Sequence, residues 1–93
     1  MTVQQFDSIW DAIEDSPAEA ANMKLRSELM IALKAHLSKA ELSQSEAARL
    51  LGVTQPRISD LMRGKINLFA LDALVNMAVA AGLRVELKVT SAG

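Results

Sequence analysis

Side chains that could hydrogen-bond to a specific partner gather in one short stretch of the chain, residues 54–65. Gln55 carries a carboxamide that donates and accepts at once, which matches the edge of adenine, and Arg57 carries a planar guanidinium that matches guanine. We expect Arg63 and Lys65 to contact phosphates rather than bases. The chemistry that this stretch predicts is recognition of duplex DNA, and its remaining polar members are Thr54, Ser59 and Asp60.

Two short helices joined by a tight turn would bring these side chains to one surface. Ser43 followed by Glu46 is a capping-box pattern, which predicts that the first helix begins at Gln44. Ala48 is small enough for two helices to cross closely at that point. Gly52 can take the positive φ that ends the first helix.

The second helix has start and stop signals of its own. Thr54 is a suitable N-cap, and Pro56 belongs in a first turn, where its missing N–H costs little. Gln55 precedes that proline and is biased away from the α region, so the helix could begin one residue later. Gly64 should end the helix, and the residues expected to face inward are Leu51, Val53, Ile58 and Leu61.

The order of these residues resembles the helix-turn-helix of the Cro/C1 or XRE class of regulators. The segments LLGVTQPRISDLMRGK, LFALDAL and AGLRVEL, between Leu50 and Leu87, resemble small HigA-type antitoxin regulators, and the similarity spans roughly residues 16–89. The resemblance implies a lambda-repressor-like bundle whose second helix lies in the major groove. Ala70 departs from it, because the family usually has a serine there that caps the next helix. The DNA-binding residues expected on this basis are Gln44, Thr54, Gln55, Arg57, Ser59, Arg63 and Lys65.

Three further helices follow from apolar spacing and capping signals. Residues 3–14 read as a short amphipathic helix, residues 17–37 as a longer one, and a last helix should start at residue 68 or 71 and end near residue 81. Ser16 and Glu19 form a second capping-box pattern, with proline at the first helical position. The fold class predicted is mainly α, with about five helices. The helix at residues 3–14 has an apolar face that could bind a partner or pack on the core. Its apolar residues are Phe6, Ile9, Trp10 and Ile13.

Residues 83–89 alternate apolar and charged side chains, which is typical of a half-buried strand. A lone strand needs a partner, so we expect a second copy of the chain to pair with it about a two-fold axis. A two-fold axis on Val85 or on Leu87 would place unlike charges opposite each other across the two strands, which is favourable. An axis on Glu86 would place like charges opposite each other. The predicted dimer interface consists of Leu83, Val85, Leu87 and Val89.

Charge is unevenly distributed along the 93 residues, which we interpret as one domain. Residues 1–22 contain five acidic and no basic residues, a net charge of −5, and the rest contains ten basic and six acidic residues, a net charge of +4. We divide the chain into an acidic helical arm (1–22), a helix-turn-helix bundle (23–82), a dimerisation strand (83–89) and a loose tail (90–93). The acidic arm could be a solvated helix face or a second binding surface.

Other classes of function find little support in the composition. There is no cysteine and only one histidine, His36, for which we expect a structural or solvent-facing role. We therefore expect no metal, no cofactor and no enzymatic activity. No apolar run reaches membrane-spanning length, and we expect a cytoplasmic location. The leading hypothesis is a repressor that binds a near-palindromic operator as a homodimer. The resemblance to HigA-type antitoxins implies a further partner, a small basic ribonuclease toxin of the RelE/HigB kind. The alternative is a stand-alone transcription factor with no toxin partner.

Overall fold

The longest element of the fold is α2 (Pro17–Ala40) in a computed structural model that describes residues 16–91. The hydroxyl of Ser16 accepts a hydrogen bond from the Glu19 amide at 2.9 Å, which is the N-cap half of the predicted capping box. The helix continues three residues past the predicted end at residue 37. It stops where Glu41 turns to φ 58° and its amide donates to the Ser38 carbonyl at 3.1 Å.

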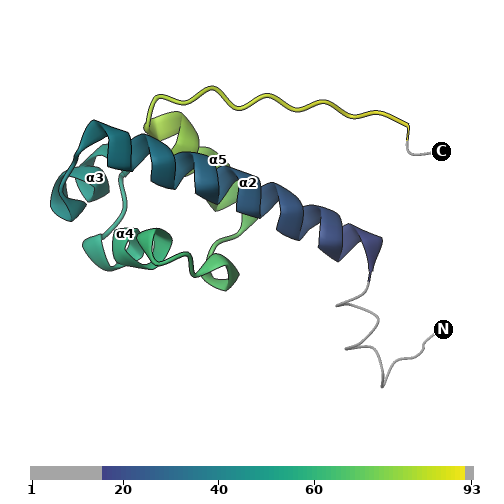
Figure 1. Ribbon diagram of the computed structural model, residues 1–93, viewed down its shortest axis with the longest axis horizontal. Helices are drawn as coiled ribbons and strands as arrows, with labels where there is room; N and C mark the ends of the chain where they lie inside the picture. Colours follow the sequence, from purple (N-terminus) through teal and green to yellow (C-terminus); the bar gives the residue numbers. More distant parts are fainter. Residues whose placement is uncertain (1–15, 92–93) are drawn as a thin grey trace, which may run out of the picture.

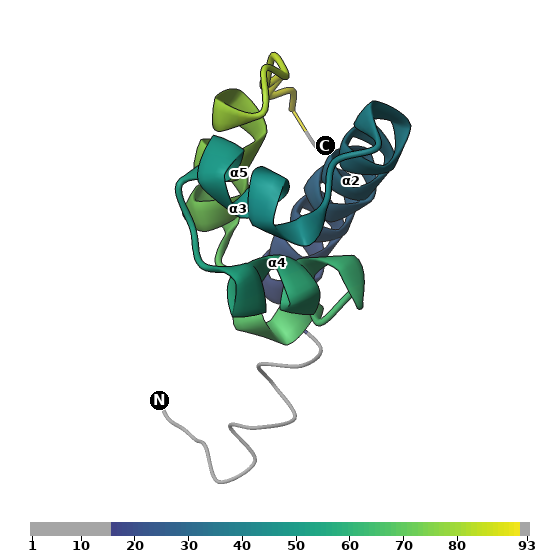
Figure 2. The same ribbon diagram turned by 90° about the vertical axis from the view of Figure 1, so that its left-hand side faces the viewer.

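Four shorter elements follow α2: α3 (Gln44–Leu51), α4 (Gln55–Met62), the 3-10 turn η1 (Ile66–Leu68) and α5 (Leu71–Ala80). α3 lies near the C-terminal end of α2, α4 lies below α2, and α5 packs along it (Figures 1 and 2). The last helix thus begins at the later of the two expected positions, because residues 66–68 form a separate turn. The described part of the chain contains four α-helices and one 3-10 turn.

The core is filled by apolar side chains from all four described α-helices and from the residue that follows η1. Burying a side chain of this size stabilises the fold by about 1.5–3 kcal/mol. Ile58 and Leu61 are 1% and 0% exposed, so the inward face of α4 is fixed firmly on the core. The largest fully enclosed side chains are Leu33, Ile58, Leu61, Phe69 and Leu74.

Arg26 ties α2 to the turn that follows α4. Its Nε atom donates to Asn22 Oδ1 at 2.6 Å, and Nη1 lies 3.3 Å from the Ile66 carbonyl oxygen and 3.4 Å from that of Phe69. Because the guanidinium is planar and carries five N–H donors, one side chain can serve three acceptors. The turn is therefore held at a fixed height along α2.

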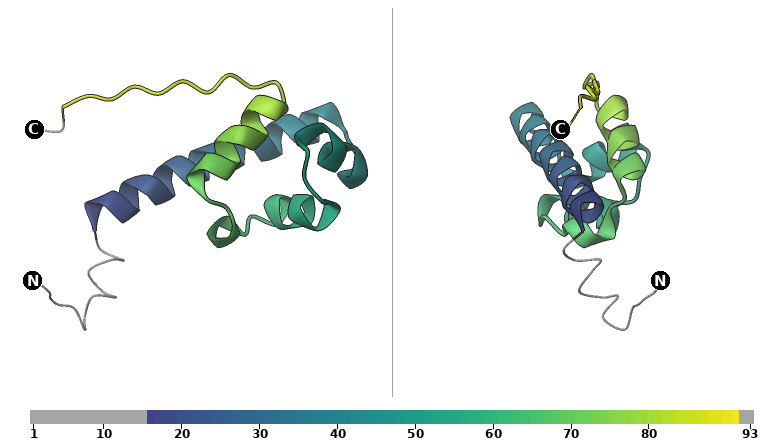
Figure 3. Two further views of the ribbon diagram at one scale, coloured as in Figure 1. Left: turned by 180° about the vertical axis from the view of Figure 1, so that it is seen from behind. Right: turned by 90° about the vertical axis from the view of Figure 1, so that its right-hand side faces the viewer.

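The described residues of the single chain contain no strand, so the predicted pairing of residues 83–89 with a second copy of the chain stays a prediction. A strand is defined by hydrogen bonds to a neighbour, and no other segment within residues 16–91 supplies them. The segment instead runs back along α2, over the gap between α2 and α5 (Figures 1 and 3). The predicted helix at 3–14, with Phe6, Ile9, Trp10 and Ile13, lies outside the described residues. Within those residues, no helix has the length and apolar character needed to cross a membrane.

Candidate nucleic-acid interface

α3 and α4 are joined by the tight turn that the sequence predicts. Gly52 has φ 71°, and its amide and that of Val53 donate to the Arg49 and Ala48 carbonyls at 3.4 and 3.0 Å. Ala48 is 6% exposed, so its small side chain lies inside the packing rather than at the surface. These features fix α4 at one orientation relative to α3.

Both helices begin with the caps that were predicted. The Ser43 amide donates to Glu46 Oε1 at 2.8 Å, and the Glu46 amide donates to Ser43 Oγ at 3.1 Å, which completes the capping box. Hydrogen bonds from the Ser43 backbone, then from its side chain, lower the pKa of the Glu46 carboxyl below its ordinary value. Thr54 Oγ1 accepts a hydrogen bond from the Arg57 amide at 3.3 Å, as an N-cap does. α4 begins at Gln55 and not one residue later.

The solvent face of α4 follows from its buried face. Helical periodicity places Pro56 and Arg63 opposite Ile58 and Leu61, with Gln55, Ser59 and Asp60 on either side. Pro56, Gln55 and Arg63 are exposed, and Ser59 and Asp60 are half-buried. Three residues predicted for this surface, Thr54, Gln55 and Ser59, are thus gathered on one side of the helix or at its start.

Arg57 is on the flank of α4 and not on its solvent face. Its Nη1 atom donates to the Leu68 carbonyl at 2.6 Å, and its guanidinium carbon lies 4.1 Å from the centroid of the Phe69 ring. The head of the side chain is therefore directed toward η1. The sequence could not show this, because the acceptor is eleven residues away along the chain.

Asp60 and Lys65 form an ion pair with 3.6 Å between Oδ1 and Nζ. Lys65 remains 45% exposed, so it can still approach a phosphate. The pairing reduces the repulsion that the Asp60 carboxylate would exert on a polyanion.

Lys34 is a candidate for this surface that the sequence did not suggest. It is on α2, yet its Nζ atom lies within 3.6 Å of the place where a Cβ on Gly64 would stand. Gly64 is between Arg63 and Lys65, so three cationic side chains surround the end of α4. Only the packing of α2 against α4 reveals this neighbour. Gln44, predicted to bind DNA, is exposed at the first position of α3.

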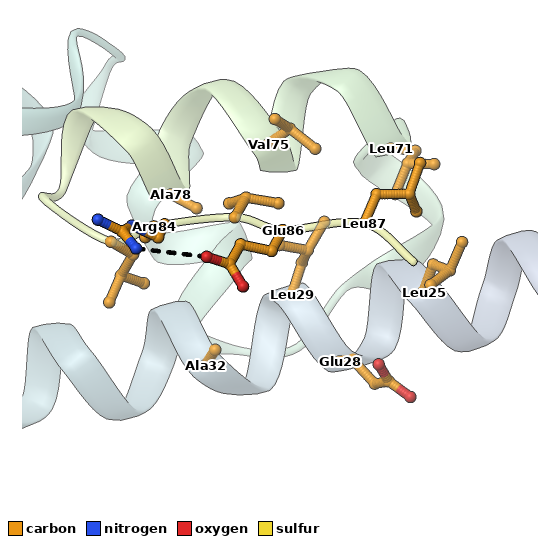
Figure 4. A pocket seen from close by; sticks show the side chains of 12 residues that line it. Leu25, Glu28, Leu29, Ala32, Leu71, Val75, Ala78, Arg84, Glu86 and Leu87 are labelled. Atoms are coloured by element: carbon orange, nitrogen blue, oxygen red, sulfur yellow. Dashed lines mark hydrogen bonds and ion pairs between the residues drawn. The ribbon is translucent and has the colours of Figure 1, made fainter. Parts of the chain in front are cut away.

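A groove of about 530 Å³ lies on another side of the molecule, between α2, α5 and residues 83–87. Figure 4 shows Leu25 and Leu29 of α2 on one side of it and Leu71 and Val75 of α5 on the other. Leu83 is half-buried, whereas Val85, Leu87 and Val89 are 37%, 78% and 81% exposed. Arg84 Nη1 and Glu86 Oε2 are 3.4 Å apart and both largely exposed.

Comparisons with known proteins agree with this geometry. A family model described as a helix-turn-helix domain matches residues 12–90. A solved structure with the provisional description XRE family transcriptional regulator superposes with a TM-score of 0.73 at 32% sequence identity, over 78% of this chain and 82% of that one. A comparison with curated proteins found no match.

Proposed function

The chain belongs to the helix-turn-helix domain family, as a DNA-binding transcriptional regulator of the XRE kind, and from this premise we propose that it is a repressor that binds a near-palindromic operator as a symmetric dimer. The family consists of regulators and not of enzymes. The observation that carries the proposal is α4, which is capped, anchored by Ile58 and Leu61, and polar on its solvent face. We call α4 the reading helix below.

The reading helix offers two kinds of contact. Gln55 and Ser59, with Thr54 at the cap, would reach base edges once the helix enters the major groove. Arg63 and Lys65 follow the helix, and Gln44 begins α3, where the backbone of the DNA would run. This division predicts sequence selectivity from the first turns and salt-dependent affinity from the cations.

Selection of duplexes from a random pool by the full chain tests this function. We expect an enriched near-palindrome whose two halves are about one DNA turn apart, roughly 34 Å. Gln55→Ala should lower the affinity for that duplex by roughly tenfold and relax selectivity at one base pair of each half. Asn76→Ala on α5, also an exposed amide, is the matched control and should change neither. Enrichment of no sequence by the folded wild-type chain would contradict the proposal.

The extended C-terminal segment supports the dimer. It carries exposed Val85, Leu87 and Val89, and no ladder of hydrogen bonds joins residues 83–90 to another described segment. A second copy that pairs antiparallel with it would supply those hydrogen bonds and cover part of the groove beneath. Leu87→Asp should therefore shift the chain to monomer in sedimentation, whereas Thr90→Asp, which adds the same charge outside residues 83–89, should not.

Cysteine cross-linking can locate the two-fold axis, because the natural chain has no cysteine. A residue on the axis of an antiparallel pair faces its own copy at about 4.5–5.5 Å between Cα atoms, within reach of a disulfide. We propose an axis on Val85 or Leu87, so Val85→Cys or Leu87→Cys should cross-link readily. Efficient cross-linking of Glu86→Cys would contradict that register.

We further propose that the repressor is the antitoxin of a toxin–antitoxin pair and represses its own operon. The sequence of residues 1–22 supports this, since it combines a net charge of −5 with apolar residues at helical spacing, a combination suited to a small basic ribonuclease of the RelE/HigB kind. A neighbouring reading frame for a short basic protein would favour this proposal, and its absence would favour a stand-alone transcription factor.

A truncation can separate the two activities. Removal of residues 1–15 keeps the Ser16 cap and Pro17, so α2 retains its own start. The truncated chain should lose neutralisation of the toxin and keep its affinity for the operator. A full-length variant in which Asp7, Asp11, Glu14 and Asp15 become amides is the matched control for charge alone. Full protection of cells by the truncated chain would contradict the antitoxin proposal.

A further inference from the structure

We infer that Arg57 is a positioning residue, which holds the reading helix at its working orientation by fastening η1 to it, and that its guanidinium does not read a base. The inference rests on the proposed DNA-reading function and concerns the same site. It replaces the role that the sequence suggests for this arginine, a paired contact to guanine.

The contacts of Arg57 join two segments that are distant in sequence. Its amide belongs to the first turn of α4, where it is bound by the Thr54 cap at 3.3 Å, while its Nη1 atom binds the Leu68 carbonyl at 2.6 Å. The guanidinium also lies 4.1 Å from the centre of the Phe69 ring, a distance typical of a cation–π contact. The start of the reading helix is thereby fixed to the end of η1.

The Phe69 ring makes this contact costly to break. The phenylalanine is 1% exposed, and the guanidinium covers one face of its ring. If Arg57 turned toward the major groove, it would leave the Leu68 carbonyl and uncover a core side chain. A guanidinium that both hydrogen-bonds and stacks cannot be replaced by a lysine ammonium, which lacks the planar fork.

A second arginine, on another helix, holds the same turn. Arg26 of α2 donates to the Ile66 and Phe69 carbonyls at 3.3 and 3.4 Å, and Arg57 of α4 takes the Leu68 carbonyl between them. The turn is therefore bound to both α2 and α4. The reading helix has only eight residues, so its orientation depends on this support as well as on Ile58 and Leu61.

The test measures operator binding by full-length Arg57→Met and Arg57→Lys well below their melting temperatures. Both variants should lower the operator affinity by about tenfold, because a displaced reading helix weakens its base contacts. The loss should be shared by all recognised base pairs in a scan of single-base operator variants. The slope of log affinity against log salt should stay that of the wild type, because no phosphate contact is removed. Amide hydrogen exchange of residues 66–69 in the free protein should rise in both variants.

Arg63→Met is the matched control, because Arg63 is an exposed arginine that follows the same helix. It should reduce the salt slope by about one unit and leave exchange at residues 66–69 unchanged. If Arg57→Met does not fold, Arg57→Lys carries the test, because it retains the charge and most of the aliphatic stem.

Three results would overturn the inference. Relaxed selectivity at a single base pair would make Arg57 a base reader, and a salt slope reduced by about one unit would make it a phosphate contact. If the folded variants bound the operator with wild-type affinity, Arg57 would contribute to stability only. These results are distinct from failure of the proposed function, in which the wild-type chain itself selects no duplex.

Discussion

His36 Nε2 lies 2.9 Å from the carbonyl oxygen of Ala81, so the single histidine of the chain ties α2 to the residue that caps α5. Because a carbonyl only accepts, Nε2 donates. Of the two roles expected for His36, structural or solvent-facing, the contact is the structural one. The contact also fixes the point from which residues 83–91 leave the bundle.

His36→Ala should lower the free energy of unfolding by about 1 kcal/mol, the usual contribution of one hydrogen bond of this kind. Urea unfolding followed by circular dichroism measures the change. Lys39→Ala, an exposed substitution three residues further along α2, is the control and should change it little. Equal effects of the two substitutions would show that the Ala81 contact does not stabilise the fold.

Gly52→Ala should destabilise the fold by roughly 1–2 kcal/mol, because residue 52 has φ 71°, a conformation that a Cβ disfavours. The cause is conformational and not steric, since nothing lies within 4 Å of the added Cβ. Gly52→Asn should recover part of the loss, because asparagine tolerates this conformation better than alanine. Thermal melts of the two variants measure the difference, and a lower melting temperature for the asparagine variant would refute the explanation.

Glu46 should make stability depend on pH in the acid range. Its pKa is lower in the folded chain than its ordinary value of 4.5, so the stability it contributes is present above pH 4.5 and is lost as the pH falls through the folded pKa. Glu46→Gln should remove this part of the acid dependence. Urea midpoints of both proteins between about pH 6 and 3 measure it, and Glu41→Gln is the control. Parallel curves for Glu46→Gln and the wild type would contradict the prediction.

Lys34→Ala should reduce the slope of log operator affinity against log salt by about 0.9 if its ammonium contacts a phosphate beside Gly64. The base preferences of the protein should be unchanged, because phosphate contacts carry no sequence information. Lys24→Ala, an exposed lysine nearer the other end of α2, should leave the slope unchanged. Titrations of the operator at several salt concentrations measure the slope. An unchanged slope for Lys34→Ala would exclude the phosphate contact of Lys34.

Local signals in the sequence were sufficient for most of the helices. The caps at Ser16, Ser43 and Thr54 and the positive φ of Gly52 all depend on residues within four positions of one another, which a sequence displays directly. At Ala70 the sequence lacks a capping side chain, and the structure shows no side-chain cap there, yet α5 begins at the next residue. Tertiary packing of Leu74 and Met77 overrides the missing cap.

The features that sequence reasoning missed all depend on distant contacts. Arg57 finds its acceptor across eleven residues, Arg26 binds a turn forty residues away, and Lys34 reaches the end of α4 from another helix. Polarity and charge alone would place all three in water. Residues 83–89 form no strand within the single chain for a related reason, since their predicted partner is a second copy of the chain and not a segment of the same one.

On α4, the side chains that support the helix are different from those that face solvent, and this separation affects how such a regulator could change its target. The side chains that support the helix, Ile58, Leu61 and Arg57, point away from solvent or toward η1, while Gln55, Ser59 and Asp60 do not contribute to the buried core. Under the proposed function, specificity can therefore diverge by exchange of Gln55 and Ser59 while Ile58, Leu61 and Arg57 are kept. An engineer could graft a new set of outward residues onto this frame and redirect it to another promoter without rebuilding the bundle.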